Sequence, residues 1–109
     1  MPAHESLSGL QFNYELKETG GSKGAHHISA SLGDQPVGSM TWRSREIQGI
    51  SVEPEHRRQG VATALWNEGQ RLASENAQIP APKHAADRTN AGDAWARSVG
   101  GRLPRRIKL

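Results

Sequence analysis

The sequence predicts a single α+β domain (mixed α/β), in which two main helices pack against a central, mostly antiparallel sheet. Three observations predict this fold class. The 109 residues fit one domain and are too few for two independent cores. The first half of the chain alternates apolar and polar residues, which is the period of half-buried strands. The second half carries two segments with apolar residues at helical spacing, and Pro80 and Pro82 lie between them.

Four antiparallel strands are expected within residues 10–53, after a tail at residues 1–9. Alternation predicts the first strand at residues 10–16 and a second strand that includes Ile28, Ala30 and Leu32. A turn signal follows at 33–36, and the third strand is expected at 37–42. A fourth strand is expected at residues 47–52, and Pro54 ends it. The second and third strands therefore form a hairpin.

A phosphate-binding turn is expected at residues 54–62, and the order helix, strand, helix, strand is expected over 63–109. After Gly60 the apolar spacing becomes helical, which places a helix at about residues 61–76. A short extended segment follows at 83–86, and a second helix begins at Thr89 or Asn90, whose side chains can cap it. Gly100-Gly101 is a natural helix end, and residues 103–109 suit a last strand.

Composition excludes several kinds of site. The chain has no cysteine, which excludes disulfides, thiolate zinc sites and cysteine nucleophiles. The formal net charge of +3 favours anionic partners without naming one. Adjacent strand residues point to opposite faces, so His26 and His27 are not expected to share a metal, and no metal site is predicted. Because neither a secretory leader nor an 18-residue apolar run is visible, no membrane partner and a cytoplasmic location are expected.

The strongest functional signal is the strand, basic turn and helix start of residues 47–65. A helix N-terminus leaves backbone N–H groups without intrahelical partners, and its dipole favours negative charge. Gly60 removes a Cβ where an anion would approach the backbone, and Ala62 stays small for the same reason. Arg57 and Arg58 add charge-assisted donors. The segment therefore predicts a phosphate or pyrophosphate site.

This turn resembles the signature of the GNAT superfamily of N-acetyltransferases. Arg57-x-x-Gly60-x-Ala62 matches the pattern Q/R-x-x-G-x-G/A, which binds the pyrophosphate of acetyl-coenzyme A in that superfamily. The preceding residues 52–57 are similar to the V-x-P-x-x-R lead-in of the family, and residues 63–66 resemble its usual helix start. The resemblance covers roughly residues 26–109, and residues 84–101 are similar to a short subgroup found in actinobacteria and their phages.

The resemblance implies a GNAT-like fold that binds acetyl-coenzyme A as acyl donor and transfers its acetyl group to an unidentified amine. The residues that it implies for coenzyme binding are Ile50, Val52, Arg57, Arg58, Gln59, Gly60, Val61, Ala62 and Thr63.

The usual proton donor of the family is missing. Many members carry a tyrosine four residues before the glycine that ends the last helix, where it protonates the departing thiolate. Counting back from Gly100 gives Ala96, which has no proton to donate. The only tyrosine in the chain, Tyr14, lies far upstream and fits a strand core.

Two residues are candidates for the catalytic base. Glu46 precedes Arg57 by 11 residues, the offset of a glutamate that deprotonates the amine in some members, and it is the preferred candidate. The alternative for Glu46 is a solvated ion pair. His84 is expected near the end of a strand that diverges from residues 47–52, beside the thioester. The alternative for His84 is a hydrogen bond to backbone at a strand–helix junction.

The family's opening helix pair is missing, because only about 25 residues precede the hairpin and none shows helical spacing. Without those helices, apolar surface and strand edges are expected to be uncovered, so self-association or a protein partner is predicted. A second interpretation is a catalytically inactive structural or interaction protein, such as a component of a phage virion. The basic cluster at residues 102–108 lacks interleaved aromatic residues, so a nucleic-acid partner is not expected.

Overall fold

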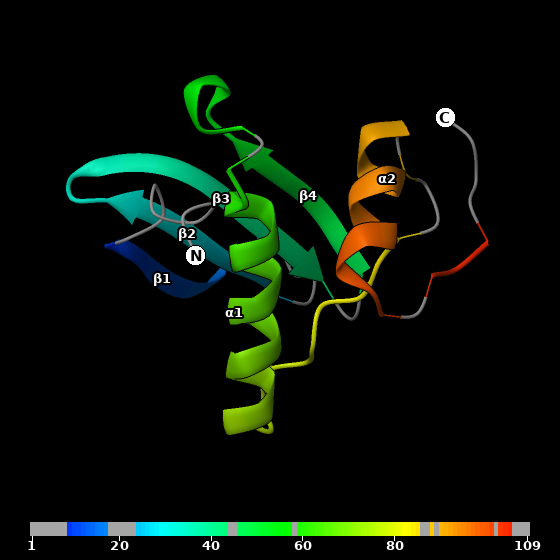
Figure 1. Ribbon diagram of the computed structural model, residues 1–109. Helices are drawn as coiled ribbons and strands as arrows, with labels where there is room; N and C mark the ends of the chain where they lie inside the picture. Colours follow the sequence, from blue (N-terminus) through cyan, green and yellow to red (C-terminus); the bar gives the residue numbers. More distant parts are fainter. Residues whose placement is uncertain are drawn as a thin grey trace.

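A computed structural model describes residues 9–17, 24–43, 46–57, 59–85, 88, 90–101 and 103–105. The described elements, in chain order, are β1 (Leu10–Lys17), β2 (Ala25–Leu32), β3 (Gln35–Arg43), β4 (Glu46–Val52), the 3-10 turn η2 (Pro54–His56), α1 (Val61–Glu75) and α2 (Asn90–Val99). Helix α1 lies across one curved sheet, and α2 lies beside β4 (Figure 1). The expected fold class is therefore confirmed: an α+β domain with an antiparallel sheet and two helices.

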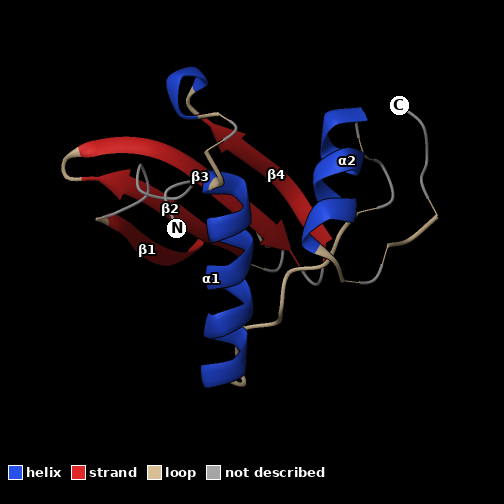
Figure 2. Ribbon diagram, in the orientation of Figure 1, coloured by secondary structure: helices blue, strands red, loops and turns tan. Residues whose placement is uncertain are grey.

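The sheet has the order β1-β2-β3-β4, and every neighbouring pair is antiparallel (Figure 2). Alternation along the strands places one set of apolar side chains on the same face, because successive strand residues point to opposite faces. On the two central strands, Ile28 pairs with Met40 and Ala30 with Gly38, and the side chains of Ile28, Ala30 and Met40 are fully buried. The core therefore lies between this face and α1.

Helix α1 crosses the apolar face of the sheet (Figure 1). Its inward positions include Val61 and Leu65, which join the main core cluster. Gly69 is the closest point of approach: a Cβ there would lie 2.8 Å from Cγ of Pro82 and 3.1 Å from Cε of Met40. Only glycine lets the helix pack this closely, so α1 is in close contact with Met40 on β3 and with Pro82 in the segment that follows α1.

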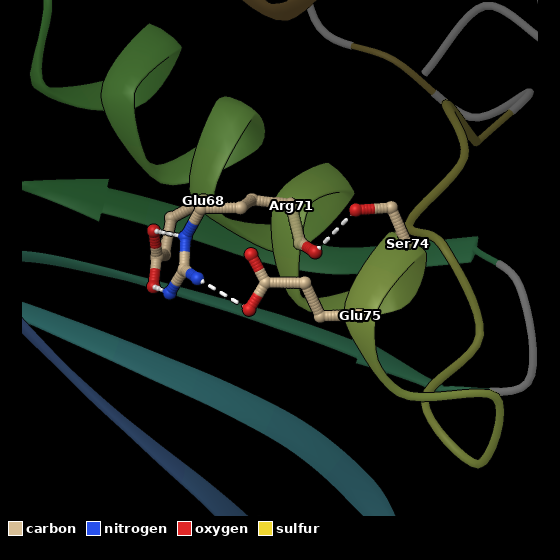
Figure 3. A network of polar contacts seen from close by, with 4 residues as sticks. All are labelled: Glu68, Arg71, Ser74 and Glu75. Carbon is tan, nitrogen blue, oxygen red and sulfur yellow. Dashed lines mark hydrogen bonds and ion pairs between the residues drawn. The ribbon is translucent and has the colours of Figure 1, made fainter.

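The outer side of α1 carries a network of polar contacts that faces solvent (Figure 3). The guanidinium of Arg71 donates to the carboxylates of Glu68, at 2.9 Å from Nε, and of Glu75, at 2.8 Å from Nη1. Ser74 donates its hydroxyl to the backbone oxygen of Arg71 at 2.7 Å. Pairs at these spacings support the exposed side of a helix.

The face of the sheet away from α1 is polar. Asn13, Ser29, Ser39 and Ser51 are consecutive cross-strand neighbours there. Leu16, at 52% exposure, is the one large apolar side chain that is exposed among the described residues. Apart from Leu16, the described residues do not show the expected uncovered apolar surface. Self-association stays a prediction without that support.

Within the described residues, the second half of the chain has less strand than predicted. Both helices occupy their predicted places, and no helix precedes Pro54 in the described ranges. Of the segment expected as a strand at 83–86, residues 83–85 form one parallel bridge, between Lys83 and Glu46, and Ile47 donates its N–H to the Lys83 oxygen at 2.9 Å. Residue 86 lies outside the described residues. Residues 103–105 are not strand, and the rest of the expected last strand lies outside the described residues. Pro80 and Pro82 contribute no N–H to a ladder, which limits pairing before Lys83.

A buried cluster of Tyr14, His26 and Trp42 joins β1, β2 and β3. The Tyr14 hydroxyl lies 2.7 Å from Nδ1 of His26, and the His26 ring stacks on Trp42 with centroids 5.3 Å apart. Burial lowers the pKa of His26 below its ordinary value of 6.5 and raises the pKa of Tyr14. The folded protein therefore favours a neutral His26, whose Nδ1 accepts a hydrogen bond from the Tyr14 hydroxyl.

Stability is expected to fall as pH decreases through the ordinary histidine pKa of 6.5. Below that value the unfolded chain binds a proton at His26 that the folded chain binds only at lower pH, so acid favours unfolding. The pKa of His27 is also lowered, chiefly by burial and then by Lys17, and acts in the same direction. Urea unfolding at pH values on either side of 6.5 measures this slope. His26→Phe should make the slope shallower, and an unchanged slope would contradict the assignment.

Candidate functional site

The predicted phosphate-binding turn joins β4 to α1 through η2. Pro54 begins η2, and its fixed φ suits the first turn of a helix. Gly60 is the N-cap of α1 with φ of 88°, a left-handed conformation that favours glycine. Ala64 donates its N–H to the Gly60 oxygen at 2.9 Å, which starts the helix. The N-cap has no side-chain cap and the first turn has no acidic residue, so its backbone N–H groups and positive dipole end suit an anion.

Side chains of the turn are held close to β4. Arg57 donates from Nε to the Val52 oxygen at 3.1 Å, which places its guanidinium at the end of that strand. Gln59 donates from Nε2 to the Glu55 oxygen at 3.3 Å. His56 carries a buried Nδ1 without a hydrogen-bond partner, a polar atom that the sequence did not single out. Arg58 lies outside the described residues.

Two adjoining cavities lie between β4 and α2, and together they form what we call the β4–α2 groove. The outer cavity, next to the turn, has a volume of 460 Å³ and is lined by Ile50, Ser51, Val52, Arg57, Ala62, Ala91, Gly92 and Trp95. The inner cavity, next to His84, has a volume of 260 Å³ and is lined by Ile47, Gln48, Gly49, Ile50, His84, Ala85, Arg88, Gly92, Trp95 and Ala96. Because Ile50, Gly92 and Trp95 line both cavities, the groove runs from the turn to His84.

His84 forms the inner end of the groove. Its side chain is 2% exposed, stacks on Trp66 with ring centroids 4.2 Å apart, and meets Trp95 edge-on. Nε2 lies 2.7 Å from the backbone oxygen of Gly100. A carbonyl oxygen only accepts, so Nε2 carries the proton and, in the neutral ring, Nδ1 keeps its lone pair. Within the described residues Nδ1 has no hydrogen-bond partner, although His84 lines the cavity.

Arg88 is the charged side chain of the inner cavity. It donates from Nε to Oδ1 of Asp93 at 3.0 Å and from Nη1 to the Ala85 oxygen at 2.6 Å. Arg97 donates from Nε to the other oxygen of the same carboxylate at 2.9 Å. Hydrogen bonds from Arg97 and Arg88 lower the pKa of Asp93, so this carboxylate is ionised at neutral pH. No pattern in the sequence pointed to Arg88.

Trp95 lines both cavities and so links the two ends of the groove. Its Nε1 donates to Oγ1 of Thr63 at 3.2 Å, which ties α2 to the first turn of α1. The ring also meets Trp66 edge-on, with centroids 5.8 Å apart. No spacing in the sequence signalled this placement.

The structure brings together part of the set expected to bind coenzyme. The side chains of Ile50, Val52, Arg57 and Ala62 line the outer cavity. Thr63 contacts Trp95 beside it. The side chain of Val61, another residue of the expected set, is instead buried in the core at 2% exposure.

The catalytic candidates are separated by the fold. Glu46 is exposed at the beginning of β4, beside Lys83, and does not line either cavity. His84 lies in the inner cavity, in the backbone-bonded arrangement that was its alternative interpretation. Ala96 is fully buried and lines the same cavity. Tyr14 lies on β1, at the opposite edge of the sheet from β4, so it cannot replace the missing acid.

The described part of the chain contains no cluster of three or more residues suited to hold a metal ion. Neither of its helices is long and apolar enough to cross a membrane.

Comparison with known proteins agrees with the turn and the fold. A sequence model described as the acetyltransferase (GNAT) family matches residues 3–96, which include the whole sheet, the turn and most of α2. This match starts upstream of residue 26, where the resemblance in the sequence was placed. No curated protein and no solved structure gives a significant match. The match concerns the family as a whole, so membership of the short actinobacterial and phage subgroup stays a prediction. The chain belongs to the acetyltransferase (GNAT) family.

Proposed function

We propose that this protein is an N-acetyltransferase that binds acetyl-coenzyme A in the β4–α2 groove and transfers the acetyl group to an amine. The observation that carries the proposal is the course of the groove. It begins at the uncapped N-terminus of α1 and ends at His84, whose Nδ1 has no partner in the described residues. An anion site and a proton acceptor at opposite ends of one groove suit a coenzyme with phosphates at one end and a thioester at the other.

The residues of the outer cavity fit the phosphate end of the coenzyme. The first turn of α1 offers N–H groups and no acidic side chain, and Gly60 leaves open the space that a Cβ would take. Arg57 adds a guanidinium at the end of β4. Further along, Ile50 and Trp95 supply apolar walls for the uncharged middle of the coenzyme.

The thioester supplies a carbonyl carbon that an amine can attack. As the C–N bond forms, the C–S bond breaks and sulfur leaves with the bonding electron pair as a thiolate. In this proposal His84 Nδ1 takes the proton that the amine loses, while Nε2 stays bonded to Gly100 and keeps the ring in place. Because Ala96 offers no acidic group, the thiolate takes its proton from His84 or from solvent.

The placement of the two candidates favours His84 over Glu46 as the base. His84→Gln is expected to lower kcat by about 10²- to 10⁴-fold, the usual contribution of a general base, with little change in coenzyme affinity. Glu46→Gln, at an exposed position outside the groove, should retain most of the activity. Steady-state kinetics, with calorimetric titration of acetyl-coenzyme A, measures both effects. A loss of activity confined to Glu46→Gln would reverse this assignment, and failure of the wild-type protein to bind the coenzyme would refute the function.

A further inference from the structure

The ring of His84 is held against the face of a second aromatic side chain. Trp66, on α1, lies parallel to it, with an angle of 3° between the two rings and 4.2 Å between their centroids. Both side chains are more than nine-tenths buried. A Cβ added at Gly101 would lie 3.2 Å from Cζ2 of Trp66 and 3.6 Å from Nε2 of His84, so the chain after α2 closes over the stacked pair. The two rings therefore have little freedom to move apart.

Among the described residues, no negative group balances a positive charge on His84. In the proposed reaction Nδ1 takes the proton of the amine, so the ring is a cation until the thiolate or solvent takes that proton. A buried cation is costly unless it is paired. The hydrogen-bond partner of the ring is the uncharged Gly100 oxygen, and no carboxylate of the described chain forms an ion pair with it. Arg88 lines the same cavity, but its charge is paired with the carboxylate of Asp93.

The indole face of Trp66 is placed to stabilise that charge. The π-system of an aromatic ring carries negative potential on its faces, so it attracts a cation within about 6 Å of its centroid, and tryptophan gives the strongest effect. The centroid of the His84 ring lies well inside this distance, and the ring is shielded from water, a setting in which the attraction is largest. Stacking on Trp66 therefore favours the protonated ring over the neutral ring.

We infer that Trp66 is a positioning residue of the reaction, which fixes the plane of the His84 ring and stabilises the positive charge that this ring carries after it takes the proton of the amine. This inference rests on the acetyltransferase function proposed above and adds a residue that acts through His84. Trp66 lines neither cavity, which agrees with an indirect role.

The test weakens the negative potential of the indole face with little change in its shape. Trp66 is replaced, by site-specific incorporation, with tryptophan that carries one, two or three ring fluorines, which withdraw electrons from the ring. NMR of the labelled imidazole nitrogens of His84 measures the protonated fraction of the ring in the whole protein between about pH 5 and 8. At a fixed pH, we expect the ratio of protonated to neutral ring to fall with each fluorine, by about 10-fold over the series.

The matched control places the same fluorinated residues at Trp42. This tryptophan is also buried and stacks on a histidine, His26, but it lines neither cavity. Fluorination there should leave the protonated fraction of His84 unchanged. If Trp66 only fills space, the series at Trp66 should be as flat as the series at Trp42, and the inference would be overturned with the acetyltransferase function intact.

Turnover of the Trp66 series, with lysine, spermidine and phenylethylamine as acceptors, tests the role in the reaction. We expect kcat to fall with the number of fluorines, while the Kd of acetyl-coenzyme A and the Tm stay constant. In His84→Gln the fluorines should have no effect on the residual kcat, because Trp66 acts through the missing ring. An equal fall of kcat with and without His84, or a constant kcat, would overturn the inference. If none of these amines is acetylated, a falling protonated fraction would still show the stabilised charge, and the failure would count against the proposed function alone.

Discussion

Gly60→Asp is expected to abolish most of the affinity of the protein for coenzyme A. The substitution adds a side chain and a negative charge at the N-cap of α1, where φ is 88° and no cap is present. An aspartate carboxylate there would accept hydrogen bonds from the backbone N–H groups of the first turn, and its charge would repel a phosphate. The loss should be about 10- to 100-fold in Kd, as for removal of hydrogen bonds to a charged group. Calorimetric titration with coenzyme A measures it directly.

Gly60→Asn is the matched control for this substitution. Asparagine has the shape of aspartate and tolerates the left-handed conformation, so the two variants differ mainly in charge. We expect Asn to weaken binding and Asp to weaken it further. Gly33→Asp places the same residue in the β2–β3 turn, also at positive φ and in open space, and should leave binding unchanged. Equal affinity of Gly60→Asp and the wild-type protein would show that the turn does not hold the phosphates.

Trp42→Ala is expected to lower the free energy of unfolding by about 3–5 kcal/mol, the usual cost of removing a large aromatic side chain from a core. Trp42 is fully buried on β3, beneath the loop that follows α1. Its Nε1 donates to the Pro80 oxygen at 2.8 Å, so it also fastens the segment that leads to His84. A domain of this size has about 5–15 kcal/mol in total, so the variant should be close to unfolding. Urea denaturation followed by circular dichroism measures the change.

Trp42→Phe separates packing from the hydrogen bond. It keeps a ring in the core but leaves the Pro80 oxygen without its indole donor. We expect a smaller loss, of about 1–3 kcal/mol for a buried acceptor left unsatisfied. Trp95→Ala, on a half-buried position of α2, should cost less than Trp42→Ala. If Trp42→Ala were as stable as the wild-type protein, the proposed position of the core would be wrong.

Local sequence was sufficient for the elements that depend on neighbouring residues. The strands from Leu10 to Val52 followed from alternation, and α1 followed from helical spacing after Gly60. The turn was also predictable, because a left-handed glycine and a helix start are properties of a few consecutive residues. These features led to the family that the comparison then confirmed.

The tertiary structure decided how distant residues meet. Lys83 forms one bridge with Glu46, and the next two residues, His84 and Ala85, line the groove where a strand was expected. This arrangement places Trp95 and Arg88 beside β4, and it separates His84 from the exposed Glu46. No spacing in the sequence encodes these distances, because they depend on where α2 lies relative to β4. Composition and local pattern thus determined the fold class and the turn, whereas packing between remote segments determined which charged and basic groups share one cavity.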